Sequence, residues 1–199
     1  LGDTTRHVRF AIVSKAKEQS PGTVSGGDAT CPFDDCGRLI SGDHIKAEAQ
    51  AGRMGEQLYT VVFKKKLITG YTKASKPKEK WVRGYRAPSP EDDVSQAVAE
   101  ALAEKLPDWE AMDMVPTERV PTDINDDRPI QYGMPLWRDL FSPRQLLGHC
   151  TAVEMFRELI EEEKAAGRWN EVTAAAFAYL SLSLDKMLNY NSRMSVWMS

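Results

Sequence analysis

Residues 58–86 read LYTVVFKKKLITGYTKASKPKEKWVRGYR. Three runs in this stretch, at 58–63, 67–72 and 81–86, are rich in Val, Ile, Thr and Tyr, and lysine, glycine and proline separate them. β-branched and aromatic residues favour strands, whereas glycine and proline favour the turns between them. We therefore expect a small, mostly antiparallel sheet in this part of the chain.

The same stretch concentrates positive charge, although the whole chain carries a net charge of −3 at pH 7. The basic residues are Lys64, Lys65, Lys66, Lys73, Lys76, Lys78, Lys80, Arg83 and Arg86. Tyr71, Trp81 and Tyr85 lie among them and offer rings on which nucleic-acid bases stack. Two interpretations stay open: a nucleic-acid-binding surface, or a solvated hairpin whose alternate residues are basic. The acidic total argues against a chain built wholly for binding polyanions.

On the N-terminal side, alternation predicts a half-buried strand in which Val8, Phe10 and Ile12 share one face and His7 lies on the other. A Gly/Ser/Pro-rich loop is expected at residues 20–30. It leads to Cys31 and Cys36, which flank a turn. A short helix capped by Ser41 or Asp43 is then expected to run to about residue 51.

Cys31 and Cys36 are candidate zinc ligands. Two thiolates on a turn are half of a tetrahedral site, which needs four ligands. Residues that would add nitrogen or oxygen ligands are His7, Asp34, Asp35, Asp43 and His44. The alternative is a cysteine-bearing turn without metal. Because the chain has three cysteines and no secretory signal, a disulfide framework is not expected.

The second half of the chain predicts helices. Ser89, Pro90, Glu91 and Asp92 form a capping sequence before an apolar helical stripe that runs from Val94 to Leu102. Residues 107–135 are acidic and rich in proline, and predict an irregular connector. A second capping sequence, Ser142-Pro143-Arg144-Gln145, opens a helix that should stop at Gly167. A last helix, about 169–188, is expected to pair antiparallel with it and to be buried on most sides.

The residues do not assemble a catalytic site. The sequence has no Walker A, His-Glu-x-x-His, Gly-x-Ser-x-Gly or Gly-x-Gly-x-x-Gly motif. We interpret Cys150 as a core thiol without a catalytic link to His149, and Asp123, Asp126 and Asp127 as a solvated loop. The absence of a long apolar run predicts a cytoplasmic protein that does not cross a membrane.

Four segments together resemble the central region of the zinc-ribbon-containing adenine-specific DNA methylases that carry a DUF1156 domain. The segments are residues 22–37 with the two cysteines, 51–58 (AGRMGEQL), 132–146 (YGMPLWRDLFSPRQL) and 189–193 (NYNSR). The match covers nearly the whole chain in order. In that family the S-adenosylmethionine loop precedes this region, and the Asp-Pro-Pro-Tyr motif follows it. The cysteine spacing departs from the family because four residues, instead of two, separate Cys31 from Cys36.

The resemblance implies a non-catalytic piece of a larger methylase. S-adenosylmethionine would be bound only by the parent enzyme, zinc is a candidate cofactor here, and the expected partners are duplex DNA and the remainder of the methylase chain. The candidate DNA-contacting residues are Arg53, Lys64, Lys65, Lys66, Arg83 and Arg144, with Arg138 read as structural. We expect an α+β fold with a ribbon-like β subdomain at residues 1–88 and a helical subdomain at 89–199. The alternative function is a protein–protein scaffold in a restriction or phage-defence assembly.

Overall fold

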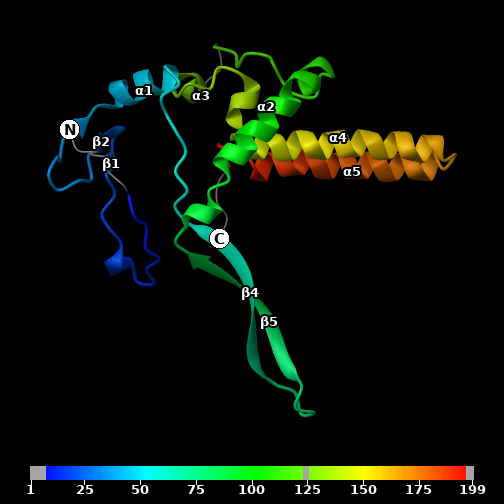
Figure 1. The fold of residues 1–199 in the computed structure, drawn as a ribbon, viewed down its shortest axis with the longest axis horizontal. Helices are drawn as coiled ribbons and strands as arrows, with labels where there is room; N and C mark the ends of the chain where they lie inside the picture. The colour runs from blue at the N-terminus through cyan, green and yellow to red at the C-terminus, as the bar shows by residue number, and fades with distance from the viewer. Residues whose placement is uncertain (1–7, 123–125, 196–199) are drawn as a thin grey trace.

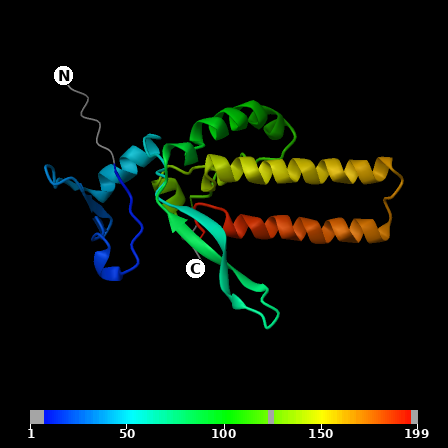
Figure 2. The ribbon, with the colours of Figure 1, turned by 60° about the horizontal axis from the view of Figure 1, so that its bottom comes forward.

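The structure, a computed structural model, describes residues 8–122 and 126–195. It confirms the α+β prediction. Three parts extend in different directions from a common junction: a small N-terminal sheet with helix α1, a long β-hairpin, and a pair of long helices (Figures 1 and 2). The strands form two separate antiparallel sheets instead of the single sheet expected.

The first sheet is a three-stranded meander of β1 (Val24–Ser25), β2 (Asp28–Thr30) and β3 (Leu39–Ile40). Gly26 and Gly27 turn the chain between β1 and β2 with φ of 61° and 96°, which glycine adopts without strain. The loop predicted at residues 20–30 therefore contains two strands. The strand predicted near Val8 is wrong, because residues 8–13 pair with no strand and all of them except the half-buried Phe10 are exposed, while His7 lies outside the described residues.

Helix α1 (Gly42–Gln50) confirms the helix expected after the cysteine turn. The Ser41 hydroxyl caps it by accepting the His44 N–H at 3.3 Å. The carboxylate of Asp28 in β2 accepts the Gly42 N–H at 2.7 Å. Because this acceptor belongs to the sheet, the start of α1 is held against the first sheet. A short 3-10 helix, Ala16–Glu18, precedes the sheet.

The second sheet is the hairpin of β4 (Val61–Tyr71) and β5 (Pro77–Arg86). The first two predicted strands merge into β4, since the lysines between them continue the pairing. At the turn, the Thr72 N–H donates to the Lys76 carbonyl at 2.8 Å. A bulge interrupts the register between Ile68 and Gly70. The hairpin extends away from the rest of the molecule (Figure 2), and most of its side chains are exposed.

The helical part contains α2 (Ser95–Ala111), α3 (Arg128–Gln131), α4 (Pro143–Ala165) and α5 (Glu171–Tyr190), with 3-10 turns at Pro90–Asp92 and Trp137–Leu140. The hydrophobic core lies between α2 and α4 and consists of Trp109, Val115, Leu146 and Cys150. Helix α2 continues through Pro107, so the connector starts later than predicted. That extension brings the fully buried Trp109 into the core.

Helices α4 and α5 confirm both the capping sequence and the antiparallel pair (Figure 1). The Ser142 hydroxyl accepts the Gln145 N–H at 3.3 Å, and the Gln145 side chain accepts the Ser142 N–H at 2.9 Å. The expected burial of α5 is wrong: Val172 is 80% exposed and Tyr179 is 75% exposed. The reason is that, among the described elements, α5 packs chiefly on α4, while α2 covers the other side of α4 (Figure 2).

Candidate nucleic-acid interface

The register of the β4–β5 hairpin sorts its basic residues onto two faces. Residues paired across antiparallel strands share a face, and the face alternates at each step along a strand. The cross-strand pairs Lys64–Arg83, Lys66–Trp81 and Val62–Tyr85 therefore lie on one face, and the pairs Lys65–Val82 and Leu67–Lys80 lie on the other. We call the surface of Lys64, Lys66, Trp81, Arg83 and Tyr85 the aromatic–basic face.

The rings of the aromatic–basic face are open to solvent. Trp81 is 60% exposed and Tyr85 is 44% exposed. The Lys66 ammonium lies 5.4 Å from the centre of the Trp81 ring and 2.7 Å from the Glu79 carboxylate. Glu79 is the one acidic residue among residues 61–86. This face thus presents three basic side chains and two aromatic rings.

Lys64 and Arg83 are opposite each other across the two strands. Like charges at such positions repel. An anion bound between them would offset that repulsion, because its attraction to both cations is strongest at short distance. The pair is therefore a suitable place for a phosphate oxygen.

The opposite face of the hairpin is more apolar. Phe63 lies directly over Gly84, where an added Cβ would come within 2.6 Å of the ring. Val61, Leu67 and Val82 share this face with Lys65 and Lys80. Sequence reasoning grouped Lys65 with Lys64 and Lys66, but the structure separates Lys65 from them.

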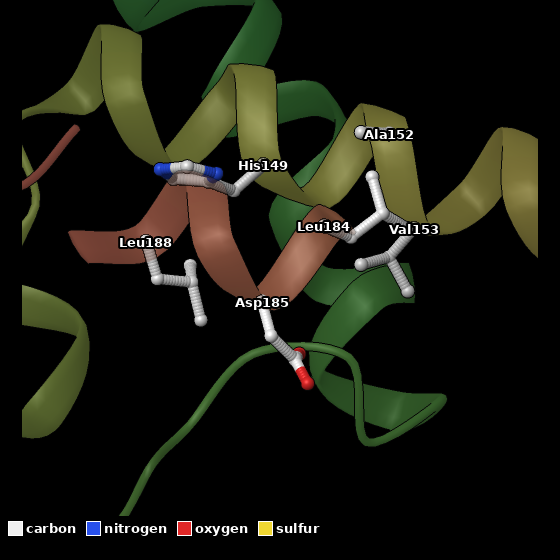
Figure 3. A pocket seen from close by; sticks show the side chains of 6 residues that line it. All are labelled: His149, Ala152, Val153, Leu184, Asp185 and Leu188. Atoms are coloured by element: carbon white, nitrogen blue, oxygen red, sulfur yellow. The ribbon is translucent and has the colours of Figure 1, made fainter. Parts of the chain in front are cut away.

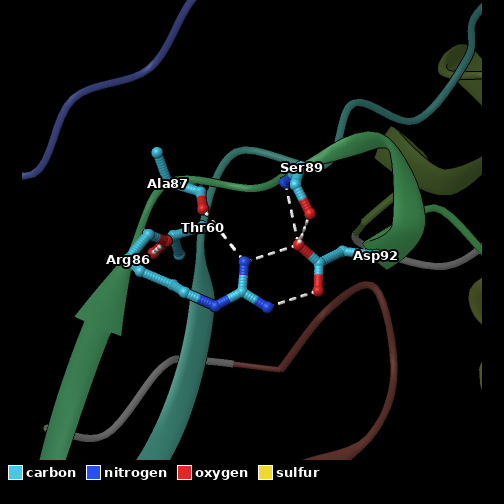
Figure 4. A network of polar contacts seen from close by, with 5 residues as sticks. All are labelled: Thr60, Arg86, Ala87, Ser89 and Asp92. Atoms are coloured by element: carbon cyan, nitrogen blue, oxygen red, sulfur yellow. Dashed lines mark hydrogen bonds and ion pairs between the residues drawn. The ribbon is translucent and has the colours of Figure 1, made fainter.

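An ion pair fixes the base of the hairpin to the helical part (Figure 4). The Arg86 guanidinium donates to both carboxylate oxygens of Asp92, at 2.6 and 2.5 Å. The backbone N–H and the hydroxyl of Ser89 also donate to this carboxylate, at 2.8 and 2.9 Å. Mainly because of the hydrogen bonds from Arg86, the pKa of Asp92 lies well below its usual range. This contact sets the direction in which the hairpin extends from the helical part.

The remaining candidate arginines lie outside the hairpin. Arg53 makes two hydrogen bonds to Glu48, at 2.6 and 2.8 Å, and these lower the pKa of that carboxyl. Arg144 is exposed in the first turn of α4. Arg138 forms an ion pair with Glu110 of α2, in keeping with the structural role expected of it.

Three of the four segments that carry the resemblance meet in space. The Arg193 guanidinium donates to Glu56 at 2.8 Å, and the Arg193 N–H donates to the Leu140 carbonyl at 2.7 Å. Gly133, with φ of 76°, lies so close to α1 that an added Cβ would be 2.2 Å from the Ala49 carbonyl oxygen. Nothing in the sequence pattern indicated that these segments touch.

Two hollows lie near this junction. One, of about 380 Å³, is lined by Ala49, Gln50, Gly52, Ile130, Gly133 and Pro135. The other lies between α4 and α5 and is lined by His149, Ala152, Val153, Leu184, Asp185 and Leu188 (Figure 3). Its volume of about 60 Å³ is far below that of sites for organic ligands. The His149 ring nitrogen Nε2 is 3.0 Å from the Asn191 carbonyl oxygen, which gives it a structural role.

The cysteine turn joins β2 to β3. The Cys31 N–H donates to the Arg38 carbonyl at 2.9 Å, and the N–H groups of Cys36 and Gly37 both donate to the Phe33 carbonyl. Cys31 is half-buried and Cys36 is exposed. Across residues 8–122 and 126–195, no cluster of three or more His, Cys, Asp or Glu side chains is arranged to hold a metal ion. The turn thus offers half of a zinc site, and zinc binding stays a prediction.

Cys150 and the aspartates at 123, 126 and 127 are the other residues considered for chemistry. Cys150 is buried in the core, and burial raises the pKa of its thiol. Asp126 pairs with Arg128, and Asp127 accepts a hydrogen bond from Gln131 at 2.7 Å, whereas Asp123 lies outside the described residues. Within the described parts, none of the helices combines the length and apolar character needed to cross a bilayer.

Comparison with known proteins adds no identification. No family model, no curated protein and no solved structure matches the chain.

Proposed function

We propose that the β4–β5 hairpin binds duplex DNA and that this chain supports target engagement within an adenine-specific DNA methylase. The observation that carries the proposal is the gathering of Lys64, Lys66, Arg83, Trp81 and Tyr85 on one exposed face of a projecting two-stranded hairpin. Neutralisation of phosphates by such cations supplies most of the sequence-independent affinity for DNA.

The shape of the hairpin suits a duplex. The major groove of B-DNA, about 12 Å wide, admits a two-stranded β-ribbon. Strand β4 has 11 residues and so spans roughly 35 Å, which is on the order of one helical turn of DNA. Because the chain is acidic overall, the positive potential of the hairpin would direct DNA to this element.

The methyl transfer itself belongs to the parent enzyme in this proposal. S-adenosylmethionine and the flipped adenine would be bound there, in the cytoplasm, and this chain would contribute binding surface. Cys31 and Cys36 would supply two thiolate ligands of a structural zinc ion. Zinc stoichiometry, compared between the unchanged chain and a Cys31→Ser, Cys36→Ser variant, tests that part separately.

Fluorescence anisotropy with a labelled duplex at two salt concentrations tests DNA binding. Lys64→Gln with Arg83→Gln removes two charges from the aromatic–basic face, and Lys65→Gln with Lys80→Gln removes two from the opposite face. We expect the first variant to bind at least several-fold more weakly and with a salt slope reduced by about 2, and the control to change little. Equal effects in both variants, or no binding by the unchanged chain, would contradict the proposal.

A protein–protein scaffold is the second candidate, and the exposed side of α5 favours it. Val172, Tyr179 and Leu182 are all more than half exposed. Association with a partner that Tyr179→Asp abolishes and that Lys64→Gln with Arg83→Gln leaves unchanged would support the scaffold.

A further inference from the structure

One row of side chains on β5 alternates aromatic and cationic groups. Trp81, Arg83 and Tyr85 are two residues apart, so all three lie on the aromatic–basic face. Lys66 and Lys64 are directly across from Trp81 and Arg83 on β4. The order along the strand is ring, guanidinium, ring.

We propose that this row binds an unpaired stretch of DNA, with bases stacked on Trp81 and Tyr85 and a phosphate held between them by Arg83 and Lys64. The proposal rests on the DNA-binding function assigned to the hairpin and names the state of DNA that the face prefers. Stacking on aromatic side chains tolerates any base, because every base has a π face.

The spacing of the two rings favours unpaired DNA over a closed duplex. Four residues along β5 separate them, which corresponds to about 13 Å. Stacked bases in a duplex strand are about 3.4 Å apart. Two bases of one strand can therefore stack on both rings only when the strand is pulled out of its helical stack, so that the faces of these bases are free. In a closed duplex, the neighbouring pairs cover the base faces that Trp81 would contact.

Lys66 occupies the place that a base would take. Its ammonium lies over the Trp81 ring at 5.4 Å and is held there by Glu79. A base that stacks on Trp81 would displace this ammonium toward solvent, where it can meet the phosphate of the incoming nucleotide. The ring has only the Lys66 ammonium over it without DNA and gains a larger stacking partner with DNA.

The experiment measures anisotropy with three labelled probes of the same sequence: a single strand, a fully paired duplex, and a duplex with a central unpaired bubble. The test variant is Trp81→Leu, and Trp81→Phe keeps a smaller ring. Trp169→Leu is the matched control, because Trp169 is also exposed and also lies under a lysine, with Lys164 at 5.6 Å, but at the turn between α4 and α5.

We expect Trp81→Leu to weaken binding to the single strand and to the bubble by roughly 5- to 100-fold, which is the range for loss of one stacked base. Trp81→Phe should weaken binding to these two probes less than Trp81→Leu does. Binding of Trp81→Leu to the paired duplex should change less than about twofold. Trp169→Leu should leave the affinity for all three probes unchanged. Retained duplex binding also shows that the hairpin of the variant is folded.

Two results would overturn the inference. If Trp81→Leu binds all three probes as the unchanged chain does, stacking is wrong while DNA binding by the hairpin stands. If the unchanged chain binds none of the probes, the proposed function and the inference fail together.

Discussion

At Gly133, both the backbone conformation and the close packing disfavour a larger residue. Its φ of 76° lies in the left-handed region, and an added Cβ would be 2.2 Å from the Ala49 carbonyl oxygen. Gly148, in the middle of α4, has neither constraint, since nothing lies within 4 Å of the position of its Cβ. Substitution by alanine should therefore have opposite effects on stability at these two glycines.

Gly133→Ala should lower the free energy of unfolding by at least about 1–2 kcal/mol from backbone conformation alone, with a further loss as α1 moves away from α3. Gly148→Ala should raise the free energy of unfolding by about 0.5–1 kcal/mol, because alanine is the better helix former. Urea denaturation of both variants checks this pair. A Gly133→Ala protein as stable as the unchanged chain would show that the junction between α1 and α3 is not as close as described.

The alternation of side chains between the two faces of β4 also shows which properties of single residues can be predicted from the sequence. The sequence placed Lys64, Lys65 and Lys66 between two predicted strands, and Lys65 lies opposite to the other two only because β4 continues through all three. The pairing of Lys64 with Arg83 is not visible in the sequence, because it depends on the length of the turn and on the bulge after Ile68. The candidate basic residues were thus predictable, whereas their grouping required the register.

Among the elements, those with local start and stop signals were predicted well. Ser41 and Ser142 cap the helices they were expected to cap, and Gly167 ends α4 with φ of 68°. The predictions were wrong where tertiary contacts determine the length or the burial of a helix. Helix α2 continues through Pro107 because the following turn carries Trp109 into the core, and α5 is apolar on several sides although only α4 packs on it.

The Arg86–Asp92 contact makes the attachment of the hairpin sensitive to pH. The pKa of Asp92 is lowered in the folded state, so the contact adds stability above the unfolded-state pKa of about 3.9 and loses that contribution as pH falls below it. Asp92→Asn removes the charge. We expect hydrogen-exchange protection of the β5 amides near Arg86 to be lower in this variant at pH 7, and the difference from the unchanged chain to narrow without closing at pH 3, because the lowered pKa keeps much of the folded-state carboxylate ionised there.

Asp126→Asn is the control for this prediction. Asp126 also pairs with an arginine, Arg128, which lowers the pKa of its carboxyl, but this pair lies beside α3. It should leave protection of β5 unchanged at both pH values. Equal protection of β5 in Asp92→Asn and the unchanged chain at pH 7 would mean that the strand ladder alone fixes the base of the hairpin.

For the whole molecule, the arrangement places the basic and aromatic residues of the hairpin apart from the contacts that join the other parts. Glu56, Leu140 and Arg193 meet at the junction although up to 137 positions separate them along the chain. Sequence pattern predicts elements from neighbours and carries no information on such distant contacts, so this convergence was missed. The β4–β5 hairpin takes little part in it, because its strands contact chiefly each other.

Replacing residues 64–83 by Asn-Gly tests whether the hairpin binds DNA while the rest of the molecule supplies the stability of the fold. Phe63 and Gly84 are opposite each other in the register, and Asn-Gly forms the type I′ turn that joins two such residues. The shortened chain should keep its helical circular dichroism and unfold within a few degrees of the unchanged chain, since the core of Trp109, Val115, Leu146 and Cys150 is untouched. It should also lose salt-dependent DNA binding. A large fall in melting temperature would show that the hairpin is part of the folding unit, and DNA binding that survives the deletion would move the interface to the rest of the molecule.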